Sequence, residues 1–288
     1  MTTTAVELRL CADQIAGAAV AALHAEAQLT PKPGLVDRRG NATHPDMSLR
    51  LLAVSAEALR KPLCDCAEAA RALEPGPALR AEIGVIGRAG EQRMLAATGG
   101  VNTHRGALWA LGLLSAGVAA SAESVETAAG FAARLAAVPD PVIVPAPLSH
   151  GQQARVRYGA GGAVAEACAG FPHVVHHGLP ALRATRLRGG NADCAALDAL
   201  LAIMARLNDT CVLHRGGRDG LAFVQRCAAE VLHSGGCLTA AGRAGLERFC
   251  AAAERRHLSM GGSADLLAAV LFLDAMFPDS PEGLPCRP

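Results

Sequence analysis

The sequence predicts an all-α protein, a single large domain with an orthogonal or bundle-like packing of many helices. Hydrophobic residues make up 51% of the 288-residue chain and aromatic residues only 3%, and Ala and Leu are strong helix formers. Apolar residues recur at helical spacing along most of the chain. The clearest strand signal, the β-branched run at residues 142–144, is short and flanked by prolines. We expect the domain to span residues 1–277 and an irregular tail to follow over 278–288.

The first expected helix covers residues 5–29, where apolar side chains fall on one helical face. Pro31 and Pro33 end it, because proline cannot donate to the helical hydrogen-bond ladder and disfavours a helical residue before it. A loop follows to Pro45, and a second helix covers residues 46–60. Further helices are expected over residues 64–73, 77–97, 103–120, 122–137, 160–170, 192–206, 217–233, 239–256 and 263–276.

Charge and cysteine content exclude several classes of protein. A formal net charge of +1 argues against a nucleic-acid-binding surface, although a small anion needs only a local patch. The ten cysteines form no paired CxxC framework, so we expect small buried hydrophobes in a reducing compartment. Neither a signal peptide nor a membrane-spanning run is predicted. We therefore expect a cytoplasmic protein without nucleic-acid or membrane partners, which could form a homodimer.

Three expected helices begin directly after glycine-rich segments, at residues 99–104, 159–162 and 259–263. Such a helix start presents free backbone N–H groups and the positive end of the helix dipole, which suits a phosphate. Each segment alone is explained equally well by a turn with a capping residue. Three in one chain favour Gly-rich loops that line a nucleotide site.

Common catalytic motifs are absent from the sequence. There is no GxxxxGK[ST] loop, no complete GxGxxG, no HExxH and no GxSxG. His173, His176 and His177 have a helical spacing that could hold a metal ion. They lie between a Phe-Pro pair and a glycine, so we expect an exposed helical turn there.

Residues 26–46 concentrate carboxylates, cations and an imidazole within one loop. Lys32 stands between two prolines that stiffen the segment, and it is one of only two lysines beside 25 arginines. A solvated loop of mixed charge is the simpler explanation, but a mere linker would not need rigid prolines. We expect these residues to form a site for a phosphorylated ligand.

The segment TPKPGLVDRRGNATHPDM at 30–47 resembles the signature of the triphosphoribosyl-dephospho-CoA synthase family. Further matching blocks follow in order: GGVNTHRGALWALGLL at 99–114, RYGAGGAVAEACAGFP at 157–172, LNDTCVLHRGG at 207–217 and LSMGGSADLLAAVLFL at 258–273. The resemblance implies an enzyme that converts ATP and 3′-dephospho-CoA to 2′-(5″-triphosphoribosyl)-3′-dephospho-CoA and adenine. It also implies that a transferase passes the product to an acyl carrier protein subunit. The wording of the blocks resembles the malonate decarboxylase branch of the family more than the citrate lyase branch.

This chemistry assigns candidate roles within the matching blocks. Mg²⁺ is the natural partner of a triphosphate and takes one or two carboxylates plus waters. The candidate metal ligands are Glu26, Asp37, Asp46, Asp209 and Asp265. The candidate catalytic residues are Asp37, His104, Asp209 and His214. The candidate substrate-binding residues are Lys32, Arg38, Asn102, Arg105, Arg215, Gly261, Gly262 and Ser263.

Simpler explanations exist for some of these carboxylates. Asp209 could cap a helix that begins after Asn208, and the dipole of a helix starting near Ser263 could favour Asp265. No helix start explains Asp37, so we expect Asp37→Asn to abolish turnover without loss of thermal stability. The acceptor hydroxyl needs a general base, for which His104, His214 and a carboxylate are all open.

Two other functions compete with the synthase. A Mg²⁺-dependent hydrolase of ADP-ribosyl groups would use water as acceptor and release its products without dephospho-CoA. A non-catalytic helical module would bind an acyl carrier subunit without binding ATP.

Overall fold

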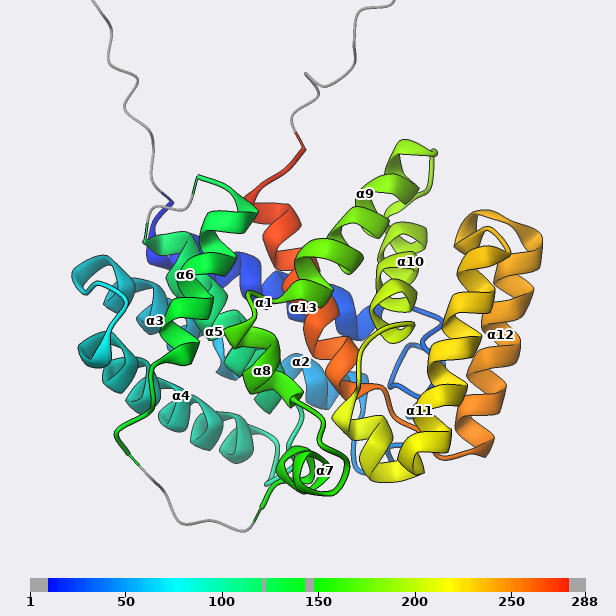
Figure 1. Cartoon of the computed structure of the whole chain (residues 1–288), viewed down its shortest axis with the longest axis horizontal. Coiled ribbons are helices and arrows are strands. Elements are labelled where there is room, and N and C mark those ends of the chain that lie inside the picture. Colours follow the sequence, from blue (N-terminus) through cyan, green and yellow to red (C-terminus); the bar gives the residue numbers. More distant parts are fainter. Residues whose placement is uncertain (1–9, 121–122, 143–147, 280–288) are drawn as a thin grey trace, which may run out of the picture.

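The computed structural model describes residues 10–120, 123–142 and 148–279, and these form an assembly of helices (Figure 1). No strand is present in these ranges; the only β-type pairing is an isolated bridge between Asp37 and Gly40. The first helices are α1 (Ala12–Gln28), α2 (Leu49–Ala58), α3 (Arg60–Ala72), α4 (Pro77–Ala97), α5 (Arg105–Ala119) and α6 (Val125–Ala137). They are followed by α7 (His150–Tyr158), α8 (Gly162–Cys168), η1 (Val174–Gly178), α9 (Leu179–Leu187), α10 (Ala192–Met204), α11 (Thr210–His233), η2 (Gly236–Leu238), α12 (Ala240–Arg255) and α13 (Gly261–Met276).

The centre of the molecule is built on α5 and α13. Both helices bury residues around most of their circumference, as expected for helices that are apolar on every side. Helix α1 packs against both of them and against α3, while α6 covers α5 and α10 packs on α13. One continuous hydrophobic core runs from Ala12 to Leu273. Two small satellite clusters lie apart from this core. The prediction of an all-α fold in a single large domain is confirmed.

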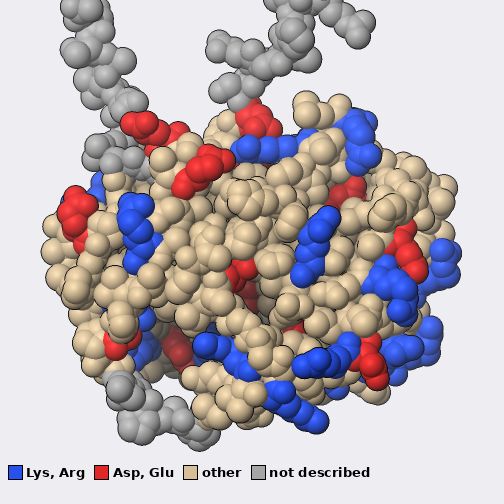
Figure 2. Space-filling view, viewed as in Figure 1, with Lys and Arg blue, Asp and Glu red and all other residues tan. Residues whose placement is uncertain are grey.

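Helices α11 and α12 form a pair at one end of the molecule, beside α10 and with α7 packed on α11 (Figure 1). Arginine side chains gather over this end in the space-filling view, whereas the middle of that face carries few charges (Figure 2). No helix of the described chain is long and apolar enough to cross a membrane.

Several helix boundaries differ from the predicted ones for identifiable reasons. Helix α2 begins at Leu49 instead of residue 46, because Ser48 is its N-cap and accepts a hydrogen bond from the Leu51 N–H. Helix α11 begins at Thr210, and its first turns, over residues 210–216, were not predicted. The predicted helix start at residue 217 is confirmed, because Gly217, with φ 60° and ψ −159°, forms a kink at which one helix ends and the next begins.

The helices α7 and α9 were not predicted, whereas η1 lies where an exposed helical turn was expected. Helix η1 is a π-helix turn, and it places His176 on the surface while His173 is half-buried and hydrogen-bonded to Glu166. The expected exposed turn is therefore only partly correct. Cys66, Cys237 and Cys250 are buried as expected, but Cys168 is exposed. Residues 143–144 of the β-branched run and residues 280–288 of the expected tail lie outside the described residues.

Candidate active site

The segment after α1 is anchored by a buried lysine. The side chain of Lys32 is 1% exposed, and its Nζ donates to the backbone oxygen and to Oε1 of Glu26, both at 2.6 Å. Glu26 lies in the last turn of α1 and is itself buried. A buried charge is tolerated only when paired and hydrogen-bonded, so this pair holds the proline-rich segment against the end of α1.

Asp37 closes the next turn of the same segment. Its carboxylate accepts hydrogen bonds from the Lys32 N–H at 3.0 Å, the Arg39 N–H at 2.7 Å and Nε of Arg39 at 3.2 Å. Asp37 is buried, so these bonds compensate the lost hydration of its charge. These hydrogen bonds give Asp37 a structural role in the loop, although it does not cap a helix.

The far end of this segment packs on residues 258–259, just before α13. Gly34 has φ +60°, and a Cβ at this position would collide with the Leu258 carbonyl oxygen. The Thr43 hydroxyl lies 3.1 Å from that same oxygen, and Nε2 of His44 lies 2.9 Å from Oγ of Ser259. These contacts join two blocks that lie more than two hundred residues apart in the sequence.

Helix α11 supplies a further connection through Arg215. Its guanidinium donates to the Thr43 carbonyl at 3.0 Å and lies 3.4 Å from Nδ1 of His44. Burial and the neighbouring Arg215 lower the pKa of His44. Arg215 therefore fixes the loop to α11, although its exposed position also allows it to contact a bound anion.

A single carboxylate caps both α11 and α13. Asp209 is the N-cap of α11 and accepts from the N–H groups of Cys211 and Val212 at 2.9 and 3.4 Å. Its other oxygen accepts from the N–H and the hydroxyl of Ser263 at 2.8 and 2.9 Å. The capping role considered for Asp209 is confirmed, and the N-terminal N–H groups that it binds are not free for a phosphate.

Asp265 reaches from α13 to the first turn of α5. A Cβ on Gly106 would collide with its carboxylate, so only glycine fits at that position of α5. Burial and the charges of Glu26 and Asp209 raise the pKa of Asp265 well above its usual value, against the smaller effect of the Ala107 N–H. We call Glu26, Asp209 and Asp265 the carboxylate cluster. It lies where α1, α5, α11 and α13 meet.

His104 lies buried directly before α5. Its Nδ1 is 2.8 Å from Oγ of Ser55, which is in turn 2.6 Å from Oγ1 of Thr103. Its Nε2 is buried and has no hydrogen-bond partner among the described residues. Burial, together with the charges of Lys32 and His24, lowers the pKa of His104 to about 4, so the imidazole is neutral at pH 7.

Known proteins resemble this chain over a range that includes all of the sequence blocks that meet at this site. Residues 12–282 match the model of a protein family described as CitG, ATP:dephospho-CoA triphosphoribosyl transferase. The chain belongs to this family. It is 55% identical over 265 residues to a protein from Pseudomonas putida, named "Probable 2-(5''-triphosphoribosyl)-3'-dephosphocoenzyme-A synthase", which covers 91% of this chain and 94% of the relative.

Two further relatives are similar over nearly the same share of the chain. A protein from Azotobacter vinelandii with the same name is 51% identical over 93% of this chain and 92% of its own length. The "2-(5''-triphosphoribosyl)-3'-dephosphocoenzyme-A synthase" of Klebsiella pneumoniae is 48% identical over 90% of this chain and 93% of its own length. No solved structure matches the chain.

The remaining predicted residues of this CitG family member lie around the carboxylate cluster or on the nearby surface. Gly261 and Gly262 form the start of α13, where a Cβ on Gly262 would lie 3.1 Å from Oδ1 of Asp209. Oδ1 of Asn102 accepts from the Arg105 N–H at 3.3 Å, just before α5. The side chain of Arg105 pairs with Glu91 of α4.

Arg38, Asp46 and His214 are exposed. Arg38 donates to Oγ1 of Thr30 within its own loop and points towards Asp193 at the start of α10. None of these three residues belongs to the carboxylate cluster. Their proposed roles in binding or catalysis stay predictions.

The described residues contain no group of three or more His, Cys, Asp or Glu side chains arranged to hold a metal ion. A site for Mg²⁺ bound to a triphosphate needs only one or two carboxylates, because phosphates and waters complete the coordination. Glu26 and Asp265 fit this need, because a cation between them would offset both the loss of hydration on burial and the mutual repulsion that raise the pKa of Asp265. Asp209 fits less well, because both of its oxygens already accept hydrogen bonds.

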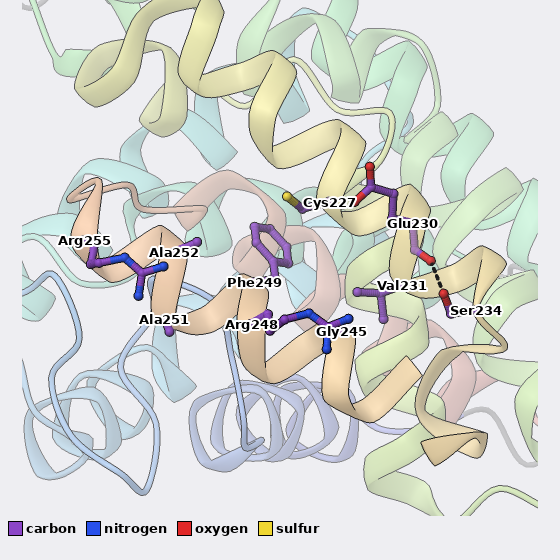
Figure 3. Close-up of a pocket in the computed structure, with 10 residues that line it drawn as sticks. All are labelled: Cys227, Glu230, Val231, Ser234, Gly245, Arg248, Phe249, Ala251, Ala252 and Arg255. Atoms are coloured by element: carbon purple, nitrogen blue, oxygen red, sulfur yellow. Dashed lines mark hydrogen bonds between the residues drawn. The ribbon is translucent and has the colours of Figure 1, made fainter. Parts of the chain in front are cut away.

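Ser55 and Thr103 were not predicted as site residues. Ser55 lies on a buried face of α2 between apolar neighbours, where the sequence offers only the weak signal of one hydroxyl in an apolar stripe. A hollow of about 410 Å³ between α11 and α12 contains none of the predicted site residues (Figure 3). We therefore place the candidate site at the carboxylate cluster.

Proposed function

We propose that this chain transfers the triphosphoribosyl group of ATP to the 2′-hydroxyl of 3′-dephospho-CoA and releases adenine. The bond from ribose C1 to the adenine nitrogen breaks, and a bond from C1 to the acceptor oxygen forms. The proton of the hydroxyl leaves to a base, and adenine takes up one proton. The observation that carries the proposal is the meeting of four sequence blocks shared with the family at one partly buried cluster of carboxylates.

The cluster suits the charge that develops in this reaction. Cleavage of a ribosyl bond passes through an oxocarbenium-like sugar, as in glycoside hydrolysis, and nearby carboxylates stabilise such a cation. Asp265 is the leading group for this role. Its carboxylate lies against the start of α5, and the Ala107 N–H is the donor that lowers its pKa, so its charge is little compensated.

The same cluster repels a triphosphate unless a cation lies between them. Glu26 and Asp265 are the residues that we propose to hold Mg²⁺. When bound, Mg²⁺ would neutralise phosphate charge and orient the triphosphate. Arg215 of α11 has an exposed side chain and could donate to phosphate oxygens as a bidentate fork, whereas the Arg105 side chain is paired with Glu91.

His104 is the base that we propose for the acceptor hydroxyl. When Nδ1–H donates to Ser55, the Nε2 lone pair is free, and the low pKa keeps it unprotonated at pH 7. A bound triphosphate would raise the pKa of His104, because nearby negative charge favours the imidazolium. This makes the imidazole a stronger proton acceptor once the substrate is present.

The direct test incubates the protein with ATP, Mg²⁺ and 3′-dephospho-CoA and follows adenine by chromatography. Adenine and the triphosphoribosyl adduct should appear together and in equal amounts. Adenine formed equally well without dephospho-CoA would instead identify a hydrolase, and absence of adenine with a folded protein would reject both. We also propose malonate decarboxylase as the destination, supported only by the resemblance of the sequence. Transfer of the product to carrier subunits of malonate decarboxylase and citrate lyase, compared side by side, tests it.

A further inference from the structure

A second cavity, of about 190 Å³, lies between α4 and α5. Its apolar wall includes Ile83, Leu108 and Trp109, and its floor contains the glycines Gly87 and Gly112. Arg105, the first residue of α5, lines the same cavity. The next residue, Gly106, lies against the Asp265 carboxylate, so the cavity and the carboxylate cluster adjoin the same end of α5.

The charges around this cavity are already compensated. Arg80 and Arg88 pair with Asp140 at 3.3 and 2.8 Å, and Arg105 pairs with Glu91. A triphosphate carries several negative charges and needs cations that are not already paired. The cavity therefore suits a largely uncharged occupant better than it suits the phosphates of ATP.

The cavity also offers one unused hydrogen-bond donor. Nε of Arg105 is buried and has no partner among the described residues. A buried donor without a partner costs free energy that an acceptor oxygen on a ligand would recover. The indole N–H of Trp109 donates to the Ala163 carbonyl at 3.2 Å, and the Arg80 guanidinium lies over the ring, 5.4 Å from its centroid.

We propose that this cavity binds the pantetheine arm of 3′-dephospho-CoA. The arm combines an apolar dimethyl group with amide carbonyls, which match the apolar wall and the free Arg105 donor. It would leave the ribose 2′-hydroxyl of the acceptor near the carboxylate cluster. This inference rests on the proposed function and adds the position of the acceptor to it.

Gly87 allows a specific test of the pantetheine site. A Cβ at Gly87 would meet no heavy atom within 4 Å, so a larger side chain can enter the cavity without a clash. Gly87→Leu should raise the KM for dephospho-CoA by about tenfold, the equivalent of about two buried methylene groups, and leave the KM for ATP unchanged. Gly87→Ala should have a smaller effect in the same direction. In the wild type, 4′-phosphopantetheine should inhibit competitively against dephospho-CoA, and Gly87→Leu should weaken this inhibition.

Gly130→Leu in α6 is the matched control. It is also a helical glycine, its Cβ would meet only Nη1 of Arg134 at 3.8 Å, and it does not line the cavity. A rise in the KM for ATP instead of dephospho-CoA, or no change in either, would overturn the inference. Calorimetric titration with 4′-phosphopantetheine separates the two proposals: binding that is weaker in Gly87→Leu supports the site even if no adenine is released, and no binding to the wild type rejects it.

Discussion

Asp37 is a buried carboxylate surrounded by hydrogen-bond donors, whereas Asp265 is a half-buried carboxylate close to other carboxylates. Asp37 accepts hydrogen bonds from three N–H groups and pairs with Arg39, so its charge supports the fold of the loop. Asp265 lies beside Glu26 and Asp209, and its pKa is raised well above the usual value by burial and their charges. A satisfied carboxylate stabilises a structure, whereas crowded carboxylates weaken it and are characteristic of functional sites. We therefore propose that the first residue serves stability and the second serves the chemistry.

The largest effect on turnover is expected at the crowded carboxylate. Asp265→Asn should lower kcat/KM for adenine release by about 10²–10³-fold, the usual loss when a group that stabilises transition-state charge is removed. The thermal midpoint at pH 7 should not fall. The folded-state pKa of Asp265 lies above its unfolded value, so its ionisation costs stability above the unfolded pKa, and the variant removes this cost.

The stability difference between Asp265→Asn and the wild type should shrink as the pH falls towards the unfolded pKa of about 3.9. Calorimetric scans at several pH values measure this difference. A variant that unfolds more readily than the wild type at pH 7 would show that Asp265 has a structural role instead.

The largest loss of stability is expected at the buried ion pair. Lys32→Met leaves Glu26 as a buried charge without its partner, which costs about 3–5 kcal/mol in the free energy of unfolding. Adding Glu26→Leu should recover much of this loss, because an apolar pair replaces the charged one without stranding a charge. Urea unfolding of the single and double variants measures the difference, and a double variant no more stable than the single would contradict it.

Asp37→Asn should act through stability and not through chemistry. Loss of the charge weakens the hydrogen bonds from three N–H donors, so we expect the free energy of unfolding to fall by about 1–3 kcal/mol.

 The folded variant should keep its turnover, in contrast to the expectation from the sequence that turnover is abolished with stability intact. Asp46→Asn is the matched control, since Asp46 is exposed and should change stability by no more than about 0.5 kcal/mol. Guanidinium unfolding and adenine release, measured on the same preparations, distinguish the two outcomes.

The smallest effect is expected in the dependence on pH. Protons and Mg²⁺ compete for Asp265, so the apparent affinity for Mg²⁺ in the presence of ATP should rise with pH in the wild type. The slope should be lower in Asp265→Asn. In the protein without ATP, His104 should show no titration near pH 6.5, because its pKa is about 4. Calorimetric Mg²⁺ titrations between pH 6 and 8.5 test this, and equal slopes in both proteins would exclude Asp265 as a ligand.

The sequence was sufficient to predict most helices, because their apolar periodicity and proline or glycine boundaries are local signals. It missed the first turns of α11, over residues 210–216, which precede the kink at Gly217. It also failed to separate the two kinds of carboxylate. Asp209 could be recognised as a capping residue from its neighbours, but its second bond, to Ser263, depends on packing between α11 and α13.

Composition and local pattern therefore determined the all-α class, the positions of most helices and the residues that form the proline-rich loop. Only the tertiary structure decided which of those residues meet. Asp37 found its donors within two to five residues along the chain, whereas Asp265 acquired its raised pKa from Glu26 and Asp209, which are distant in sequence. Hydrogen bonds within a turn follow from local geometry, but the electrostatic environment of a buried group depends on every element packed around it.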